Sequence, residues 1–187
     1  MQNPRLAHRY AKSLMDLALE RGELEAVHTD MQWLQAVCRS NRDFVALLRS
    51  PIIKADAKKK IVAAVTNGHI GALTAAFNNL LVQKGREGFL PEIITHFIAS
   101  YKEHKRIRTV KLATAAPITE ALRQSIIAQV KKEGQYEAVE LEETVNPGII
   151  GGFVLQIGDK MVDASVAYDL RTIARQFEKN DFIYNIR

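Results

Sequence analysis

The sequence predicts an α+β fold in two parts, a six-helix bundle over residues 1–106 followed by a small mixed α/β domain over residues 107–187. Through residue 106, apolar side chains recur at spacings of three and four, which mark one face of a helix. After residue 106, short segments alternate apolar and polar residues, as strands do. The 187 residues are 47% hydrophobic and 25% charged, which favours a globular protein over a disordered one.

Start and stop signals bound the first predicted helix. Asn3 is a suitable N-cap, Pro4 fits the first helical position, and Gly22 can end the helix in a left-handed conformation. The apolar stripe of this helix comprises Leu6, Tyr10, Leu14 and Leu17. The stripe of the second helix comprises Leu24, Val27, Met31, Leu34 and Cys38. Both stripes are predicted to face the core of the bundle.

Four more helices complete the predicted bundle. Asn41 caps a third helix that ends before Pro51, and a fourth runs roughly over residues 56–66. The fifth helix ends near Gly85, and the sixth begins near Pro91. The predicted core stripe of the fifth helix is Leu73, Phe77, Leu80 and Leu81.

The remaining residues predict a strand, a helix, three strands and a last helix. The ranges are 109–115, 119–132, 139–145, 149–157, 160–163 and a helix capped by Ser165. Gly158-Asp159 is typical of a hairpin turn between the last two strands. Gly151 and Gly152 interrupt an apolar strand, which indicates a bulge, a close backbone approach or a partner contact.

Charge and cysteine content exclude several classes of protein. The single cysteine, Cys38, cannot form an internal disulfide and is expected to be a small core residue. The N-terminus lacks the apolar core of a signal peptide, so no export is expected. Residues 61–83 carry no Lys, Arg, Asp or Glu, but their Thr, Asn, His and Gln side chains argue against a transmembrane segment.

No enzyme signature is found. The glycines match no phosphate-binding loop, and the five histidines lack metal-ligand spacing, so we predict no catalytic, cofactor-binding or metal-binding residues. The net charge of +5 and the run Lys58-Lys59-Lys60 leave a nucleic-acid-binding module as an alternative function. Because no aromatic residue accompanies this run, we expect an exposed, solvated helix face instead and no nucleic-acid partner.

Several motifs, in their order along the chain, resemble the delta subunit of bacterial F-type ATP synthases, the counterpart of the mitochondrial oligomycin-sensitivity-conferring protein. They are RYAK at residues 9–12, SPII at 50–53, NNLL at 78–81, KGR at 84–86, VNPGIIGGFVLQIGD at 145–159 and DASV at 163–166. The last two resemble the signature stretch of the family. The resemblance extends over essentially the whole chain.

The resemblance implies a non-catalytic stator subunit on the cytoplasmic face of the bacterial inner membrane, without a transmembrane segment of its own. The N-terminal domain would receive the N-terminal helix of an alpha subunit in a groove between the first and fifth helices. The C-terminal domain would hold the b subunits of the peripheral stalk, so that proton-driven rotation is coupled to ATP synthesis.

Seven residues are candidates for partner binding. For the groove they are Tyr10, Ala11 and Lys12 on the first helix and Asn78 and Val82 on the fifth, because Asn78 and Val82 lie off the predicted core stripe. Close packing within the bundle explains the small residues equally well, and Tyr10 is also a candidate core residue. In the C-terminal domain the candidates are Gly151 and Gly152.

Overall fold

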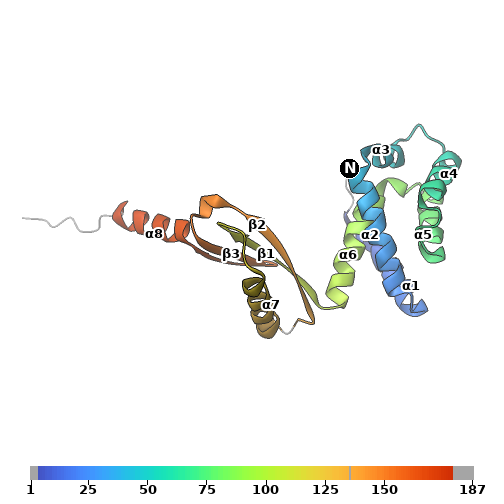
Figure 1. The fold of residues 1–187 in the computed structure, drawn as a ribbon. Coiled ribbons are helices and arrows are strands. Elements are labelled where there is room, and N and C mark those ends of the chain that lie inside the picture. The colour runs from blue at the N-terminus through green and yellow to red at the C-terminus, as the bar shows by residue number, and fades with distance from the viewer. Residues whose placement is uncertain (1–3, 135, 179–187) are drawn as a thin grey trace, which may run out of the picture. The chain divides into compact units, whose positions relative to one another are not determined.

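The computed structural model describes residues 4–134 and 136–178, and it confirms the α+β fold class (Figure 1). The chain forms two compact units, Met1–His104 and Lys105–Arg187. This division lies two residues before the boundary that we expected between residues 106 and 107. The first unit is helical, and the second carries all the strands of the described residues.

The N-terminal unit contains the six predicted helices in order. They are α1 (Pro4–Arg21), α2 (Leu24–Ser40), α3 (Arg42–Arg49), α4 (Ala55–Thr66), α5 (Ala72–Gln83) and α6 (Leu90–His104), with a short 3₁₀ helix η1 (Glu87–Phe89) before α6. Helices α1 and α2 both pack along α6. Ile93, Ile94 and Phe97 of α6 are completely buried and lie at the centre of the core.

Local hydrogen bonds explain where the helices begin and end. Gly22 has φ +69°, and the N–H groups of Gly22 and Glu23 donate to the carbonyls of Leu19 and Ala18, which closes α1 as predicted. Asn41 accepts a hydrogen bond from the N–H of Phe44 at 3.1 Å and caps α3 as predicted. The predicted cap at Asn3 lies outside the described residues.

Helix α5 receives its N-terminal cap from another helix. Gly71 precedes α5 and has no side chain with which to cap it. Instead, Oδ2 of Asp30 in α2 accepts hydrogen bonds from the N–H of Gly71 at 2.8 Å and from Oγ1 of Thr74 at 2.6 Å. The buried carboxylate of α2 therefore accepts the hydrogen bond of a free N–H group at the start of α5, forty-one residues away in the sequence. This contact joins the two helices.

The buried faces of α1 and α5 differ from the predicted stripes. In α1 the buried residues are Ala7, Ala11, Leu14, Met15 and Ala18, and in α5 they are Leu73, Thr74, Asn78, Leu81 and Val82. Leu17 and Leu80 are 37% and 43% exposed, so their placement in the core was wrong. In α1 the face rich in small residues is buried, because small side chains let the backbone of a neighbouring helix approach closely.

The C-terminal unit is a four-stranded sheet with two helices. Its elements are β1 (Ile107–Thr114), α7 (Glu120–Gly134), β2 (Ala138–Val145), η2 (Pro147–Ile149), β3 (Gly152–Ile157), β4 (Lys160–Ser165) and α8 (Val166–Glu178). The strand order is β2-β1-β3-β4. Strands β1 and β2 are parallel and joined through α7, whereas β3 pairs antiparallel with both β1 and β4.

The third strand begins three residues later than predicted. Residues 147–149 form the 3₁₀ helix η2, in which Asn146 Oδ1 accepts a hydrogen bond from the N–H of Gly148 at 3.0 Å. Ile150 then adopts a left-handed φ of +67°, so the extended chain starts only at Gly152. The predicted hairpin is confirmed, with Gly158 at φ +58° between β3 and β4.

Candidate protein-interaction surfaces

The predicted groove residues fall into two classes of exposure. Lys12 is exposed and Tyr10 is half-buried. Ala11 has no exposed surface, and Asn78 and Val82 are 3% and 4% exposed. The expectation that Asn78 and Val82 lie off the core stripe was therefore wrong. Contact of any of the five residues with a partner stays a prediction.

Apolar side chains of α1 and α5 remain at the surface beside the buried residues. The rings of Tyr10 and Phe77 meet edge to face across the two helices, with centroids 6.5 Å apart. Leu17 lies seven residues after Tyr10, about two turns further along the same face of α1, and Leu80 lies three residues after Phe77 on α5. We call these four residues, Tyr10, Leu17, Phe77 and Leu80, the α1–α5 surface. They are half-buried or exposed in the described chain.

Asn78 lies on α5 directly after Phe77 and faces the interior. Neither Nδ2 nor Oδ1 of its amide has a hydrogen-bond partner among the described residues. A buried polar group without a partner costs about 1–3 kcal/mol. Asn78 is therefore a buried residue of α5 in spite of its polar side chain.

The basic run on α4 is only partly a solvated face. Lys58 is 4% exposed, and its Nζ donates hydrogen bonds to Oε1 of Glu87 at 2.6 Å and to the carbonyl of Leu48 at 2.9 Å. Lys59 and Lys60 are exposed. The predicted exposure of Lys58 was wrong, because Lys58, Val62 and Thr66 follow one another at intervals of four and form the buried face of α4.

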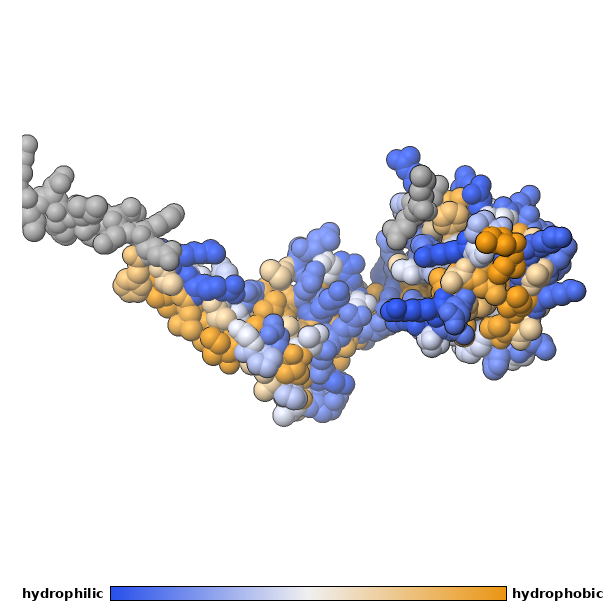
Figure 2. All heavy atoms as spheres, turned by 90° about the horizontal axis from the view of Figure 1, so that it is seen from above, coloured by the Kyte–Doolittle hydropathy of each residue, from blue (hydrophilic) through white to orange (hydrophobic). Residues whose placement is uncertain are grey.

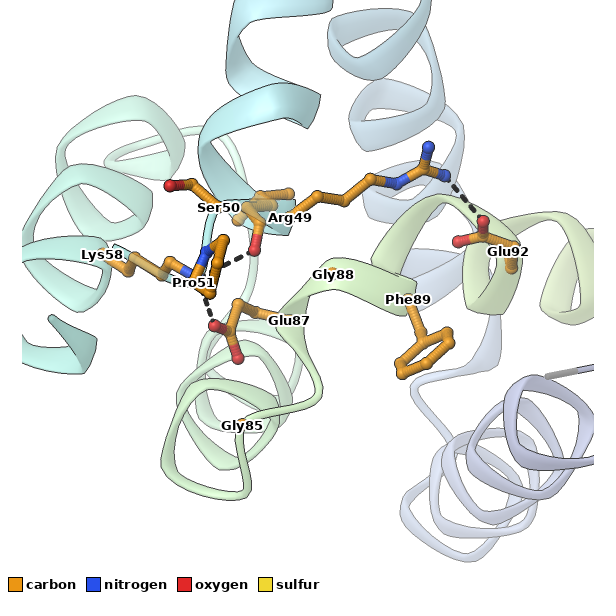
Figure 3. A pocket seen from close by; sticks show the side chains of 10 residues that line it. Arg49, Ser50, Pro51, Lys58, Gly85, Glu87, Gly88, Phe89 and Glu92 are labelled. Carbon is orange, nitrogen blue, oxygen red and sulfur yellow. Dashed lines mark hydrogen bonds and ion pairs between the residues drawn. The ribbon is translucent and has the colours of Figure 1, made fainter. Parts of the chain in front are cut away.

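A cavity of about 430 Å³ adjoins this ion pair at the ends of α3, η1 and α6. Figure 3 shows Lys58 and Glu87 pointing toward each other on one side and Arg49 reaching Glu92 on the other. Each cation is matched by a carboxylate, at 2.6 Å and 2.7 Å. The first pair holds α4 to η1 and the second holds α3 to α6. Because each of these two cations is paired, the pairs present no excess of positive charge to a nucleic acid.

Gly151 and Gly152 lie where β3, β4 and α8 meet. Gly152 has φ +74°, and a Cβ atom there would lie 2.1 Å from the carbonyl oxygen of Ala164 in β4. The carbonyl of Gly151 accepts a hydrogen bond from the N–H of Val166 at 3.0 Å, at the start of α8. Close backbone approach within the unit therefore explains the glycine pair. A partner contact by these glycines stays a prediction.

Two polar residues of the signature stretch organise the start of α8. Asp163 Oδ1 accepts a hydrogen bond from the N–H of Ser165 at 3.0 Å, and hydrogen bonding to Ser165 holds the pKa of Asp163 below its ordinary value. Ser165 Oγ in turn accepts from the N–H of Tyr168 at 3.2 Å, which confirms the predicted cap. These residues serve the fold of the unit.

Helix α8 carries an apolar stripe along one side. Val166, Leu170, Ile173 and Phe177 recur at spacings of four, three and four, and they are between 41% and 80% exposed. Figure 2 shows hydrophobic side chains along α8 beside hydrophilic ones. Within the described residues, α8 packs mainly against β4 and η2, which leaves this stripe open. An exposed stripe of this kind is typical of an interaction surface.

A trough of about 640 Å³ lies between α7 and the β3–β4 hairpin. Its apolar lining includes Ile126 and Val130 of α7, Phe153 and Leu155 of β3, and Val162 of β4. Phe153 is 40% exposed and Val162 is 56% exposed. The sequence does not predict this surface, because a strand pattern does not reveal which part of a sheet a helix covers.

The described residues contain no group of three or more His, Cys, Asp or Glu side chains that could hold a metal ion. Cys38 is half-buried, and burial together with the charge of Glu92 raises the pKa of its thiol to about 11. Such a thiol is a poor nucleophile at neutral pH. None of the described helices is both long enough and apolar enough to cross a bilayer.

Comparison with known proteins decides the family. The profile of the ATP synthase delta (OSCP) subunit family matches residues 6–177, which include parts of both units. The chain belongs to the ATP synthase delta (OSCP) subunit family. It is 36% identical to ATP synthase subunit delta of Cytophaga hutchinsonii over 98% of this chain and all of that one. It is 32% identical to ATP synthase subunit delta of Christiangramia forsetii over the full length of both.

The fold of this chain also occurs among solved structures. A chain of the cryo-EM structure of the Toxoplasma gondii mitochondrial ATP synthase hexamer matches with a TM-score of 0.72 and 23% identity, over 95% of this chain and 98% of that one. Membership in the delta family confirms the resemblance drawn from the sequence motifs. It associates the chain with the F-type ATP synthase.

Proposed function

We propose that the chain is a non-catalytic stator connector of an F-type ATP synthase. The N-terminal unit binds the N-terminal helix of an alpha subunit, and the C-terminal unit binds the b subunits of the peripheral stalk. The connector holds the catalytic head against rotation, so that proton flow is coupled to ATP synthesis. It acts as a peripheral subunit on the cytoplasmic face of the bacterial inner membrane.

The observation that supports this proposal is an exposed apolar surface on each unit of a delta-family chain. A connector needs two separate interaction surfaces, whereas an enzyme needs a constellation of reactive groups. The first surface is the α1–α5 surface. The second comprises the α8 stripe and the trough beside α7.

On the N-terminal unit, the proposed contact residues change from those expected by sequence. An amphipathic helix gains free energy mainly by burying apolar side chains against apolar walls. Tyr10, Leu17, Phe77 and Leu80 offer such walls. Ala11, Asn78 and Val82 lie beneath them and support the two helices from inside.

Titration of a synthetic peptide of the alpha-subunit N-terminal helix, by calorimetry, tests the N-terminal contact. Leu80→Glu places a carboxylate in the proposed interface, which costs a few kcal/mol when the carboxylate is desolvated without a partner. We expect the affinity to fall by more than about tenfold, because each 1.4 kcal/mol is a factor of ten. The matched control is Ile52→Glu, the same charge change at an apolar residue that is 89% exposed in the α3–α4 loop.

Equal affinities of folded Leu80→Glu and Ile52→Glu proteins for the peptide would remove the α1–α5 surface from the proposal. Ala11→Glu is unsuitable for this test. Because Ala11 is completely buried, a carboxylate there would destabilise the bundle itself, and a loss of affinity could not be assigned to the partner contact.

A further inference from the structure

Two histidines from distant parts of the sequence meet between α1 and α6. His8 lies in α1 and His96 lies in α6, and their ring centroids are 6.0 Å apart with the ring planes at 79°. The two helices pack along each other in the N-terminal unit. His8 is exposed and His96 is half-buried, so an ion from solvent can reach the pair.

The separation of the rings fits two imidazoles that share one metal ion. A bond between Zn²⁺ and a histidine nitrogen is about 2.1 Å long, and the ring centre lies about 1.1 Å behind that nitrogen. At the tetrahedral angle of about 109°, the centroids of two such rings are about 5.3 Å apart. The observed separation of 6.0 Å is larger by less than about 1 Å, a difference that small rotations of the two side chains remove.

The type of ligand selects the type of ion. Imidazole nitrogen binds Zn²⁺, Ni²⁺ and Cu²⁺, whereas Mg²⁺ and Ca²⁺ prefer oxygen ligands. Among the described residues, no third His, Cys, Asp or Glu joins the pair to form a larger metal-binding group. Two histidines fill two positions of a tetrahedral ion, and water completes its coordination.

The charges beside the two histidines act on a dication in opposite directions. Glu92 lies one turn before His96 on the same side of α6, and its Oε2 is buried without a hydrogen-bond partner among the described residues. The other oxygen of this carboxylate, Oε1, pairs with Arg49 at 2.7 Å. Lys12 lies one turn after His8 on α1 and is exposed. The carboxylate attracts a dication, and the ammonium group repels it.

We infer that His8 and His96 form a bridging site for one Zn²⁺ ion, or a transition-metal dication of similar chemistry, which joins α1 to α6. The spacing of histidines in the sequence predicted no metal-binding residues, because packing of the two helices forms this pair. The ion stabilises the N-terminal unit, since the unfolded chain has no preformed pair to bind it.

This site is independent of the proposed function and leaves the α1–α5 surface open. His8 and Tyr10 are two residues apart in α1, which places their side chains about 200° apart around the helix axis. The metal site therefore lies on the flank of α1 that faces α6, and the ring of Tyr10 lies on the flank that meets Phe77 of α5.

Calorimetric titration of the full-length chain with Zn²⁺, in a buffer without chelators, tests the site. We expect saturable Zn²⁺ binding and no binding of Mg²⁺. His8→Ala and His96→Ala should each weaken Zn²⁺ binding more than about tenfold, because loss of even an outer partner of a metal ligand costs about ten- to hundredfold. The matched control is His69→Ala, which removes an exposed histidine whose ring stacks on Trp33 at 4.7 Å.

Two further measurements test the neighbouring charges and the bridge. Glu92→Gln should weaken Zn²⁺ binding about two- to fivefold and Lys12→Gln should strengthen it by a similar factor, with both effects smaller at high salt. Thermal unfolding of the unchanged chain should shift to higher temperature as Zn²⁺ is added. The His8→Ala protein should lose this shift and still fold, because His8 is exposed.

The outcomes distinguish a bridging pair from ordinary surface binding. Equal Zn²⁺ affinities of the His8→Ala, His96→Ala and His69→Ala proteins, all folded by circular dichroism, would exclude the pair as the site. A loss of affinity in only one of the first two would show binding to a single histidine and overturn the bridge. If His96→Ala does not fold, His96→Gln takes its place. Zn²⁺ binding without a thermal shift would contradict the joining of α1 to α6, and no binding by the unchanged chain would overturn the site.

Discussion

Gly152 is the position where a single added carbon should disrupt the C-terminal unit. Its φ of +74° lies in the left-handed region, which costs a side chain about 1–2 kcal/mol. A Cβ atom would also lie 2.1 Å from the Ala164 carbonyl oxygen, well inside van der Waals contact. Relief of this overlap requires the ends of β3 and β4 to separate, with loss of hydrogen bonds worth about 1 kcal/mol each.

We therefore expect Gly152→Ala to destabilise the β3–β4 hairpin by about 3 kcal/mol, and Gly152→Val by more. A unit of this size has a total stability of roughly 4–12 kcal/mol, so the loss is a large fraction of it. Gly151→Ala is the matched control. A Cβ at Gly151 would meet only the Val166 side chain at 3.2 Å, and the φ of Gly151 needs no glycine, so we expect a loss below about 1 kcal/mol.

Hydrogen exchange with mass spectrometry measures the local stability of the β3–β4 hairpin in the full-length chain. Peptides that contain β3 and β4 should lose protection in the Gly152→Ala protein and keep most of it in the Gly151→Ala protein. Equal protection in the two variants would refute the packing explanation. A Gly152→Val protein that is folded but shows impaired coupling in reconstituted vesicles would instead indicate that Gly152 contacts a partner.

Two further predictions concern the separate units and the cysteine. A fragment of residues 1–104 should be helical and unfold cooperatively, because its core lies within its own unit; an unfolded fragment by circular dichroism would contradict the domain division. Alkylation of Cys38 by iodoacetamide at pH 8 should be about 100-fold slower than in the urea-unfolded chain, because burial raises the thiol pKa from 9.0 to about 11 and lowers the thiolate fraction. Equal alkylation rates would show that the pKa of the thiol is not raised by folding. The raised thiol pKa also predicts that the free energy of unfolding falls as pH rises above about 9, where the thiol ionises in the unfolded chain but not in the folded one.

The order and ends of the helices could be predicted from the sequence because their signals are local. Asn41 caps α3 through a contact three residues away, and Gly22 closes α1 through contacts within five residues. The motifs of the delta family were also readable, since they occur in order along the chain. The sequence predicted a partner groove between α1 and α5. It did not predict which residues of these two helices remain exposed.

Tertiary structure decided which faces are buried and which polar groups meet. A helix with apolar residues on two sides, such as α1, has two possible core faces. Only the packing of the neighbouring helices decides that Ala11 is buried and Leu17 is exposed. The cap of α5 by Asp30 and the pairing of Lys58 with Glu87 join residues more than twenty-five positions apart. The contact that excludes a side chain at Gly152 joins two strands in the same way. Such contacts leave no periodic signal in the chain, because they depend on how whole elements pack against one another.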